Sequence, residues 1–191
     1  MKRCILFAFL TLAAGCGSPA VVPSAYDSYN SKGGTFACDA PQSWEVSGGG
    51  KRGPEWAKFV SGSAEIKLTA DAEGSLMADA SGGRTADPEL PLDLHPVHIL
   101  HVEDMDRIGE DFAEYKEIAG PLLHDVPLGP GRISEFTAVS SFGSPLHGYR
   151  ASILGKDKRV VAVCVCPETE WTALKPAFDK VLGSIQRGVK E

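Results

Sequence analysis

Three histidines lie within seven residues of one another, and two acidic residues follow closely. They are His95, His98 and His101, followed by Glu103 and Asp104. Imidazoles and carboxylates are ligands that zinc and copper prefer, so this segment is a candidate metal site. The spacing argues against it, because a helix spreads the three rings over about 120° and a strand turns the middle ring away. We therefore expect a solvent-facing run, with a periplasmic metal-binding or hydrolytic protein as the alternative.

The other common signatures of catalysis are missing from the sequence. It contains no Gly-x-Ser-x-Gly nucleophile motif, no phosphate-binding glycine loop with its Lys and Ser or Thr, and no His-Glu-x-x-His zinc motif. We therefore predict that the protein is not an enzyme and that it has no catalytic residue and no cofactor.

The N-terminus combines a basic segment, a short apolar segment and a cysteine. Lys2 and Arg3 precede the apolar residues Cys4–Ala14, and the run ends in Leu12-Ala13-Ala14-Gly15-Cys16. This arrangement resembles a bacterial lipoprotein signal peptide. The apolar segment is too short for a transmembrane helix, which needs roughly 20 residues.

The lipoprotein resemblance implies a location in the cell envelope. Residues 1–15 would be removed as a signal peptide, and Cys16 would carry acyl chains such as palmitate that anchor the exported protein to a membrane. Gly17 stands where an Asp would retain such a protein at the inner membrane, so the outer membrane is favoured if the cell has two. The alternative is an ordinary secretory signal that leaves Cys16 as a thiol.

The chain is acidic once this signal is set aside. The full sequence has 19 basic and 25 acidic residues and a net charge of −6. Without Lys2 and Arg3 the basic residues number 17, and the charge becomes −8. Such a balance disfavours a nucleic-acid partner. We expect membrane contact through the acyl chains and a protein partner in the envelope.

Two further regions follow the signal. Residues 16–34 are rich in Ser, Gly and Pro and show no apolar period, so they predict a lipidated cysteine followed by a flexible tether. Residues 35–191 are long enough for a single globular domain with a core of its own.

The last third of the chain has the pattern of an antiparallel meander. Strands are expected over Arg132–Ser141, His147–Leu154 and Arg159–Cys166, after an earlier hairpin formed by Trp56–Val60 and Glu65–Thr69. The strand before Pro167 is apolar on both sides, so layers should cover it on both sides.

Two helices are expected to supply these layers. One spans Asp104–Ala119 and ends at Gly120-Pro121; the other begins near Trp171, contains Pro176 and continues to Ile185. The predicted fold class is α+β, an antiparallel sheet covered by helices on both faces.

Scattered residues of the domain resemble the PsbP-like family. They are Phe36-x-Cys38-x-Ala40-Pro41-x-x-Trp44, then Val165-Cys166-Pro167, Trp171, Phe178 and Ser184. The family includes photosystem extrinsic subunits, a Ran-binding import factor and bacterial lipoproteins. The resemblance implies an antiparallel sheet between helical layers and a non-enzymatic binding or accessory role.

Three cysteines remain in the domain. Cys164 and Cys166 lie two apart on one strand, about 6.6 Å between Cα atoms, which is poor geometry for a mutual disulfide. Two interpretations stay open: a disulfide of Cys38 with Cys164 or Cys166, or three buried thiols. A reactive C-x-C site is a third, weaker one, because this strand is apolar.

Overall fold

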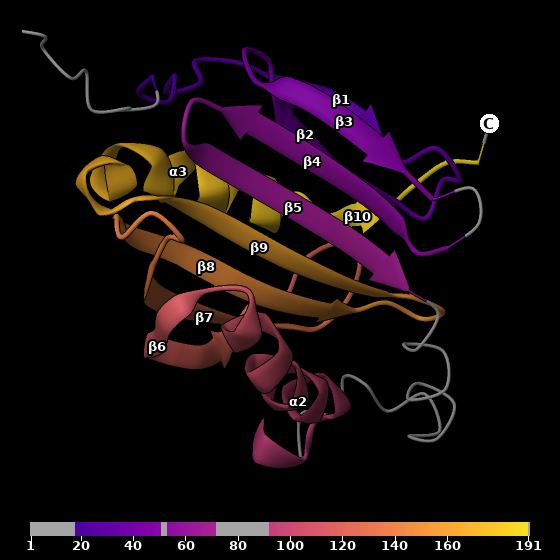
Figure 1. Ribbon diagram of the computed structural model, residues 1–191. Helices are drawn as coiled ribbons and strands as arrows, with labels where there is room; N and C mark the ends of the chain where they lie inside the picture. The colour runs from indigo at the N-terminus through magenta and orange to yellow at the C-terminus, as the bar shows by residue number, and fades with distance from the viewer. Residues whose placement is uncertain (1–17, 51–52, 72–91, 191) are drawn as a thin grey trace, which may run out of the picture.

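The computed structural model describes residues 18–50, 53–71 and 92–190 as two β-sheets and two α-helices (Figure 1). The helices are α2 (Pro96–Glu110) and α3 (Trp171–Gly183), with 3-10 turns η1 (Leu92–Leu94) and η2 (Glu168–Glu170). Within these ranges neither helix has the length and apolarity that a membrane crossing requires. The predicted signal peptide 1–15 and lipid-attachment residue Cys16 lie outside the described residues.

A seven-stranded sheet forms the body of the molecule. Its strands lie in the order β3-β4-β5-β9-β8-β7-β6, and each neighbouring pair is antiparallel. They are β3 (Glu45–Gly49), β4 (Glu55–Ser61), β5 (Ala64–Asp71), β6 (Ala113–Leu123), β7 (Gly131–Val139), β8 (Pro145–Leu154) and β9 (Arg159–Pro167). The predicted meander is confirmed as β7, β8 and β9, and the predicted hairpin as β4 and β5.

A smaller sheet and helix α3 cover one face of the large sheet. The small sheet has the order β1-β2-β10, with β1 (Tyr26–Asn30), β2 (Phe36–Pro41) and β10 (Gln186–Arg187). Helix α3 packs against β2, β8 and β9. Phe36, Phe59 and Phe178 are fully buried in the apolar core between these layers. The predicted terminal helix is confirmed, with Pro176 inside it.

Strand β8 separates this apolar core from a polar layer. Tyr149 and Ile153 belong to the core, whereas Arg150 and Ser152 hydrogen-bond to His101 of α2. Successive residues of a strand point to opposite faces. Helices α2 and α3 therefore lie on opposite sides of β8.

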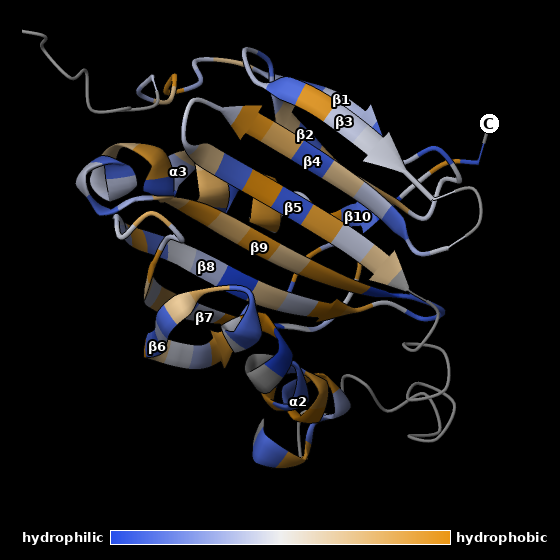
Figure 2. Cartoon of the chain, viewed as in Figure 1, coloured by the Kyte–Doolittle hydropathy of each residue, from blue (hydrophilic) through white to orange (hydrophobic). Residues whose placement is uncertain are grey.

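Among residues 18–50, 53–71 and 92–190, the expected cover on both sides of β9 is complete only on its inner side. Figure 2 shows β9 as apolar along almost its whole length. On the outer side, Val161, Val163 and Val165 are only half-buried. Helix α2 lies on this side but packs against β6, β7 and β8. A hollow of about 340 Å³ lies on this outer face, beside the end of α2.

The helix predicted over Asp104–Ala119 is wrong in position. Helix α2 begins earlier, at Pro96, since proline is tolerated in the first turn of a helix. The second half of the predicted segment lies in strand β6, where pairing with β7 overrides the local helical pattern. Because β6 is an irregular edge strand, it accommodates the Gly120-Pro121 pair that was expected to end the helix.

The tether predicted over residues 16–34 is folded where the structure describes it. Strand β1 pairs along its whole length with β2. Before β1, the Glu170 carboxylate accepts a hydrogen bond from the Ala20 N–H at 3.0 Å, and Ser61 Oγ accepts one from the Val21 N–H at 2.9 Å. The described domain therefore begins well before residue 35.

A single substitution in β1 distinguishes a folded strand from a tether. The ring of Tyr29 packs edge-on against Phe59 with centroids 5.3 Å apart. We expect Tyr29→Ala to lower the free energy of unfolding by about 2 kcal/mol, because it removes an aromatic side chain from the core margin. The exposed Ser28→Ala should change it by less than about 0.5 kcal/mol. Denaturant unfolding measures both, and equal stability of both variants would indicate a tether.

Candidate functional site

The three histidines of the candidate metal site do not converge. His101 is fully buried and His95 almost so, while His98 is half-buried. In the three described stretches, no group of three His, Cys, Asp or Glu side chains is placed to hold a metal ion. The geometry gives the metal-site alternative no support. The expectation of a solvent-facing run is also wrong, because α2 begins at Pro96 and turns His101 toward the sheet.

His101 is part of a polar layer between α2 and the sheet. Its Nδ1 lies 3.0 Å from Ser152 Oγ and its Nε2 lies 2.9 Å from Ser134 Oγ. Burial, with the positive charges of Arg150 and Arg132 and the neighbouring His98 adding to it, lowers the pKa of His101 to about 3. The imidazole is therefore neutral near pH 7, and its role is to join α2 to the sheet.

The three cysteines that the structure describes, Cys38, Cys164 and Cys166, are free, buried thiols. Burial raises the pKa of both Cys38 and Cys166 to about 12 and also raises that of Cys164. A thiolate is the reactive form of cysteine. The geometry therefore does not support the C-x-C redox hypothesis, and the disulfide of Cys38 stays a prediction for experiment.

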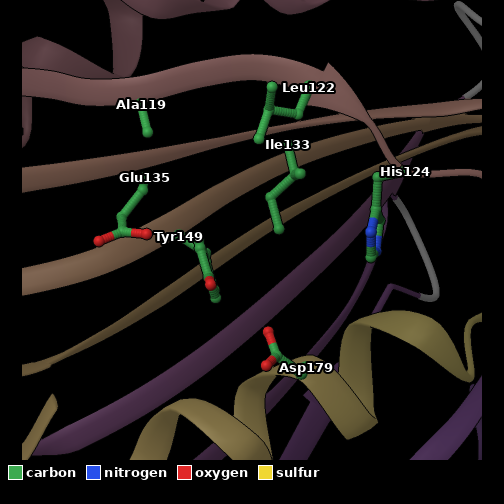
Figure 3. A pocket seen from close by; sticks show the side chains of 7 residues that line it. All are labelled: Ala119, Leu122, His124, Ile133, Glu135, Tyr149 and Asp179. Atoms are coloured by element: carbon green, nitrogen blue, oxygen red, sulfur yellow. The ribbon is translucent and has the colours of Figure 1, made fainter. Parts of the chain in front are cut away.

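A cleft lies between the end of the large sheet and helix α3 (Figure 3). It has a volume of about 330 Å³, in the range of small-ligand sites. Its lining residues come from β6, the following loop, β7, β8 and α3: Ala119, Leu122, His124, Ile133, Glu135, Tyr149 and Asp179. Leu122 pairs with Ile133 across β6 and β7, so together they form an apolar wall.

A buried histidine holds Glu135 in the cleft wall. His147 Nε2 lies 2.8 Å from Glu135 Oε1, and its Nδ1 lies 2.9 Å from Glu168 Oε2. The ring also stacks on Trp171, with centroids 4.0 Å apart and planes 8° apart. The imidazole of His147 thus bridges two carboxylates and joins the cleft wall to η2.

Asp179 faces Glu135 and Tyr149 from helix α3 (Figure 3). Its carboxylate accepts a hydrogen bond from Lys175 Nζ at 2.9 Å, and the same ammonium lies 5.3 Å from the centre of the Tyr149 ring. Burial raises the pKa of Tyr149, so its phenol stays protonated near neutral pH. The cleft thus contains two carboxylates, and one of them, Asp179, is paired with Lys175.

His124 contributes a third acceptor. The backbone of Leu182 hydrogen-bonds to this imidazole, while burial lowers its pKa and keeps it neutral. Nε2 is buried and has no hydrogen-bond partner among the described residues, so the bond to Leu182 falls to Nδ1. A neutral imidazole that donates from Nδ1 offers Nε2 as an acceptor.

The chemistry of the cleft is therefore one-sided. Glu135 and Asp179 present carboxylate acceptors beside the apolar side chains of Leu122 and Ile133. The complementary group is a hydrogen-bond donor, preferably cationic, on an apolar stem.

Comparisons with known proteins bear on the fold. No protein-family model matches the sequence, and no curated protein matches it. The solution structure of cyanobacterial PsbP (CyanoP) from Synechocystis is similar, with a TM-score of 0.58 and 13% identity over 92% of this chain and 98% of that one. LpqN of Mycobacterium tuberculosis, described as involved in cell envelope biogenesis, has a TM-score of 0.49 and 7% identity over 81% and 84%. The fold is therefore PsbP-like, as the sequence resemblance implied.

The state of the cysteines is directly measurable. Because Cys38, Cys164 and Cys166 are buried thiols of high pKa, we expect none to be alkylated in the native protein and all to be alkylated after denaturation without reductant. Mass spectrometry of the peptides measures the alkylation of each of these three cysteines and distinguishes them from Cys4 and Cys16. A peptide linking Cys38 to Cys164 or Cys166 would establish the disulfide instead.

The buried imidazole of His101 predicts a pH dependence of stability. Its pKa is about 3 in the fold against 6.5 ordinarily, so between these values the unfolded chain binds a proton that the folded imidazole does not. The free energy of unfolding should then fall as pH decreases from about 6.5 toward 3, by up to about 1.4 kcal/mol per pH unit from this group.

Two variants isolate that contribution. His101→Asn keeps a polar side chain between the two serines and should have a shallower pH slope than the wild type. The exposed Ser28→Ala, which removes no titratable group, should keep the wild-type slope. Chemical denaturation between pH 4 and 7 measures all three proteins, and identical slopes for wild type and His101→Asn would contradict the prediction.

Proposed function

We propose that this protein is an envelope lipoprotein, anchored by acyl chains on Cys16, that acts as a non-enzymatic binding module. The lipoprotein-like signal supports the export and the anchor, with the outer membrane favoured where a cell has two. The PsbP-like fold supports an accessory or binding role. In this proposal α2 and α3 are the helical layers on the two faces of the sheet.

The acceptor-lined cleft is the observation that carries the binding proposal. Its two carboxylates favour a ligand that supplies N–H donors and positive charge. Leu122, which is exposed, provides apolar surface at its edge. A lysine or arginine side chain of an envelope protein has both properties, because its stem is apolar and its head is a cation.

The cleft is less suited to catalysis. Its hydroxyl, that of Tyr149, has a pKa raised by burial, whereas a catalytic nucleophile is activated by a lowered pKa or by an adjacent base. Glu135 is engaged by His147 and Asp179 by Lys175. These partners hold the carboxylates as fixed acceptors, which suits recognition.

Titration with N-acetyl-arginine amide tests the cleft without knowledge of the partner. We expect nuclear magnetic resonance shifts centred on His124, Glu135 and Asp179. Asp179→Asn should weaken binding by about fivefold, because one charge-assisted hydrogen bond is worth about 1 kcal/mol or more.

Asp157→Asn is the matched control for this titration. It removes the same charge from a half-exposed carboxylate that pairs with Arg187 at 3.2 Å, outside the cleft lining. It should leave binding unchanged. Shifts scattered over the surface, or equal weakening by both variants, would count against the cleft as the binding site.

A further inference from the structure

The turn between β7 and β8 displays the most exposed large apolar side chain of the described residues. Phe142 is 95% exposed. The turn that holds it is ordered by hydrogen bonds, since Ser140 Oγ accepts from the N–H groups of Phe142 and Ser144. The Gly143 N–H also donates to the Ser140 carbonyl, at 2.9 Å.

The segment around Phe142 carries no charge. Residues 140–146 read Ser-Ser-Phe-Gly-Ser-Pro-Leu. An aromatic side chain at the head of an uncharged turn can leave water without taking an ionised group with it. A phenyl ring as exposed as that of Phe142 gains free energy when an apolar phase removes it from water.

The position of the turn in the molecule indicates which apolar phase Phe142 meets. Strand β8 starts beside the end of β9, because Leu146 pairs with Pro167. The chain then continues into η2, where the Glu170 carboxylate binds the Ala20 N–H. Phe142 and the first described residues therefore lie at the same end of the molecule. Figure 1 shows the indigo N-terminal segment, the start of α3 and the β4–β5 turn at this end.

Cys16 is tied closely to this end. Ser18 is two residues from Cys16, a reach of at most about 7 Å. Ser18 is itself adjacent to the β4–β5 turn, since a Cβ on Gly62 would touch its carbonyl. Acyl chains on Cys16 would hold the Phe142 end of the domain against the lipid surface.

We propose that the uncharged β7–β8 turn inserts Phe142 into the lipid bilayer beside the acylated Cys16, so that the domain has one fixed orientation on the membrane. This inference rests on the proposed lipoprotein anchor. The bilayer fits the turn because one aromatic ring on a neutral tip needs an apolar phase and no specific pairing groups. Acyl chains and an inserted aromatic together give two points of attachment, which a flexible anchor lacks.

Fluorescence quenching by brominated lipid tests the orientation. The full protein, purified from bacterial membranes, is reconstituted in phosphatidylcholine vesicles containing brominated phosphatidylcholine. Phe142→Trp places a reporter on the turn. Lys156→Trp places one on the exposed β8–β9 turn, at the other end of the same strand and roughly 33 Å away.

Emission is compared with that of the wild type, which already contains three tryptophans. We expect the emission added by Phe142→Trp to be mostly lost on bromination and that added by Lys156→Trp to be kept. Equal quenching, or none at either position, would overturn the proposal and leave Phe142 as a contact for protein.

A second arm separates this proposal from the anchor itself. Cys16→Ser with a hexahistidine tag directly ahead of Ser18 is bound to vesicles through a nickel-chelating lipid, and the same two reporters are measured. The mass of the N-terminal peptide tests acylation independently. An unmodified Cys16 with selective quenching in the tagged chain would remove the lipoprotein anchor but keep the turn as a membrane contact. An acylated Cys16 without selective quenching would support the lipoprotein anchor and overturn the turn as a membrane contact.

Discussion

The burial of Arg150 constrains the outer half of this structure. Its guanidinium is completely buried on β8, and a buried charge is tolerated only when it is paired and hydrogen-bonded. Nε and Nη2 donate to Glu117 Oε1 of β6 at 3.0 and 2.6 Å, and Nη1 donates to the His101 carbonyl of α2. The side chain therefore requires both β6 and α2 in their observed places.

This requirement also creates the cleft. Because Glu117 binds Arg150, β6 is held at the edge of the sheet. The later residues of β6 then form part of the sheet face on which α3 packs. Ala119 and Leu122 then face Asp179 across open space. The polar layer under α2 and the cleft on the opposite face are consequences of one strand order.

Much of the fold was predictable because its signals are local. The alternation of apolar Tyr149 with polar Arg150 and Ser152 indicated a strand with one solvent-facing side, but that side is buried under α2. The apolar run after Arg159 indicated a central strand. The position of α2 was not predictable in the same way. Met105, Ile108 and Phe112 have helical spacing in the sequence, but the segment after Glu110 pairs with β7 instead. Long-range pairing decided that boundary, and β1 was missed for the same reason.

The candidate site was hidden from the sequence for a different physical reason. Glu135 and Tyr149 were placed on predicted strands, but their approach to Asp179 depends on where α3 lies over the sheet. The unpartnered nitrogen of His124 depends on the Leu182 backbone, which occupies the other nitrogen. The sequence drew attention to the three spaced histidines His95, His98 and His101. The histidine of the cleft, His124, stands alone in the sequence after β6.

The arrangement of cleft and anchor has a consequence for the partner. Along β7, Ile133 lies six residues before Val139, where the turn bearing Phe142 begins, so this wall of the cleft is roughly 20 Å from the turn. With the proposed turn in the bilayer, the cleft would lie roughly 20 Å farther along β7 from the lipid than the turn. A segment of a neighbouring envelope protein could bind it at that height. The fixed orientation would keep the acceptors at one height above the membrane, which restricts partners to those that present a cation at that height.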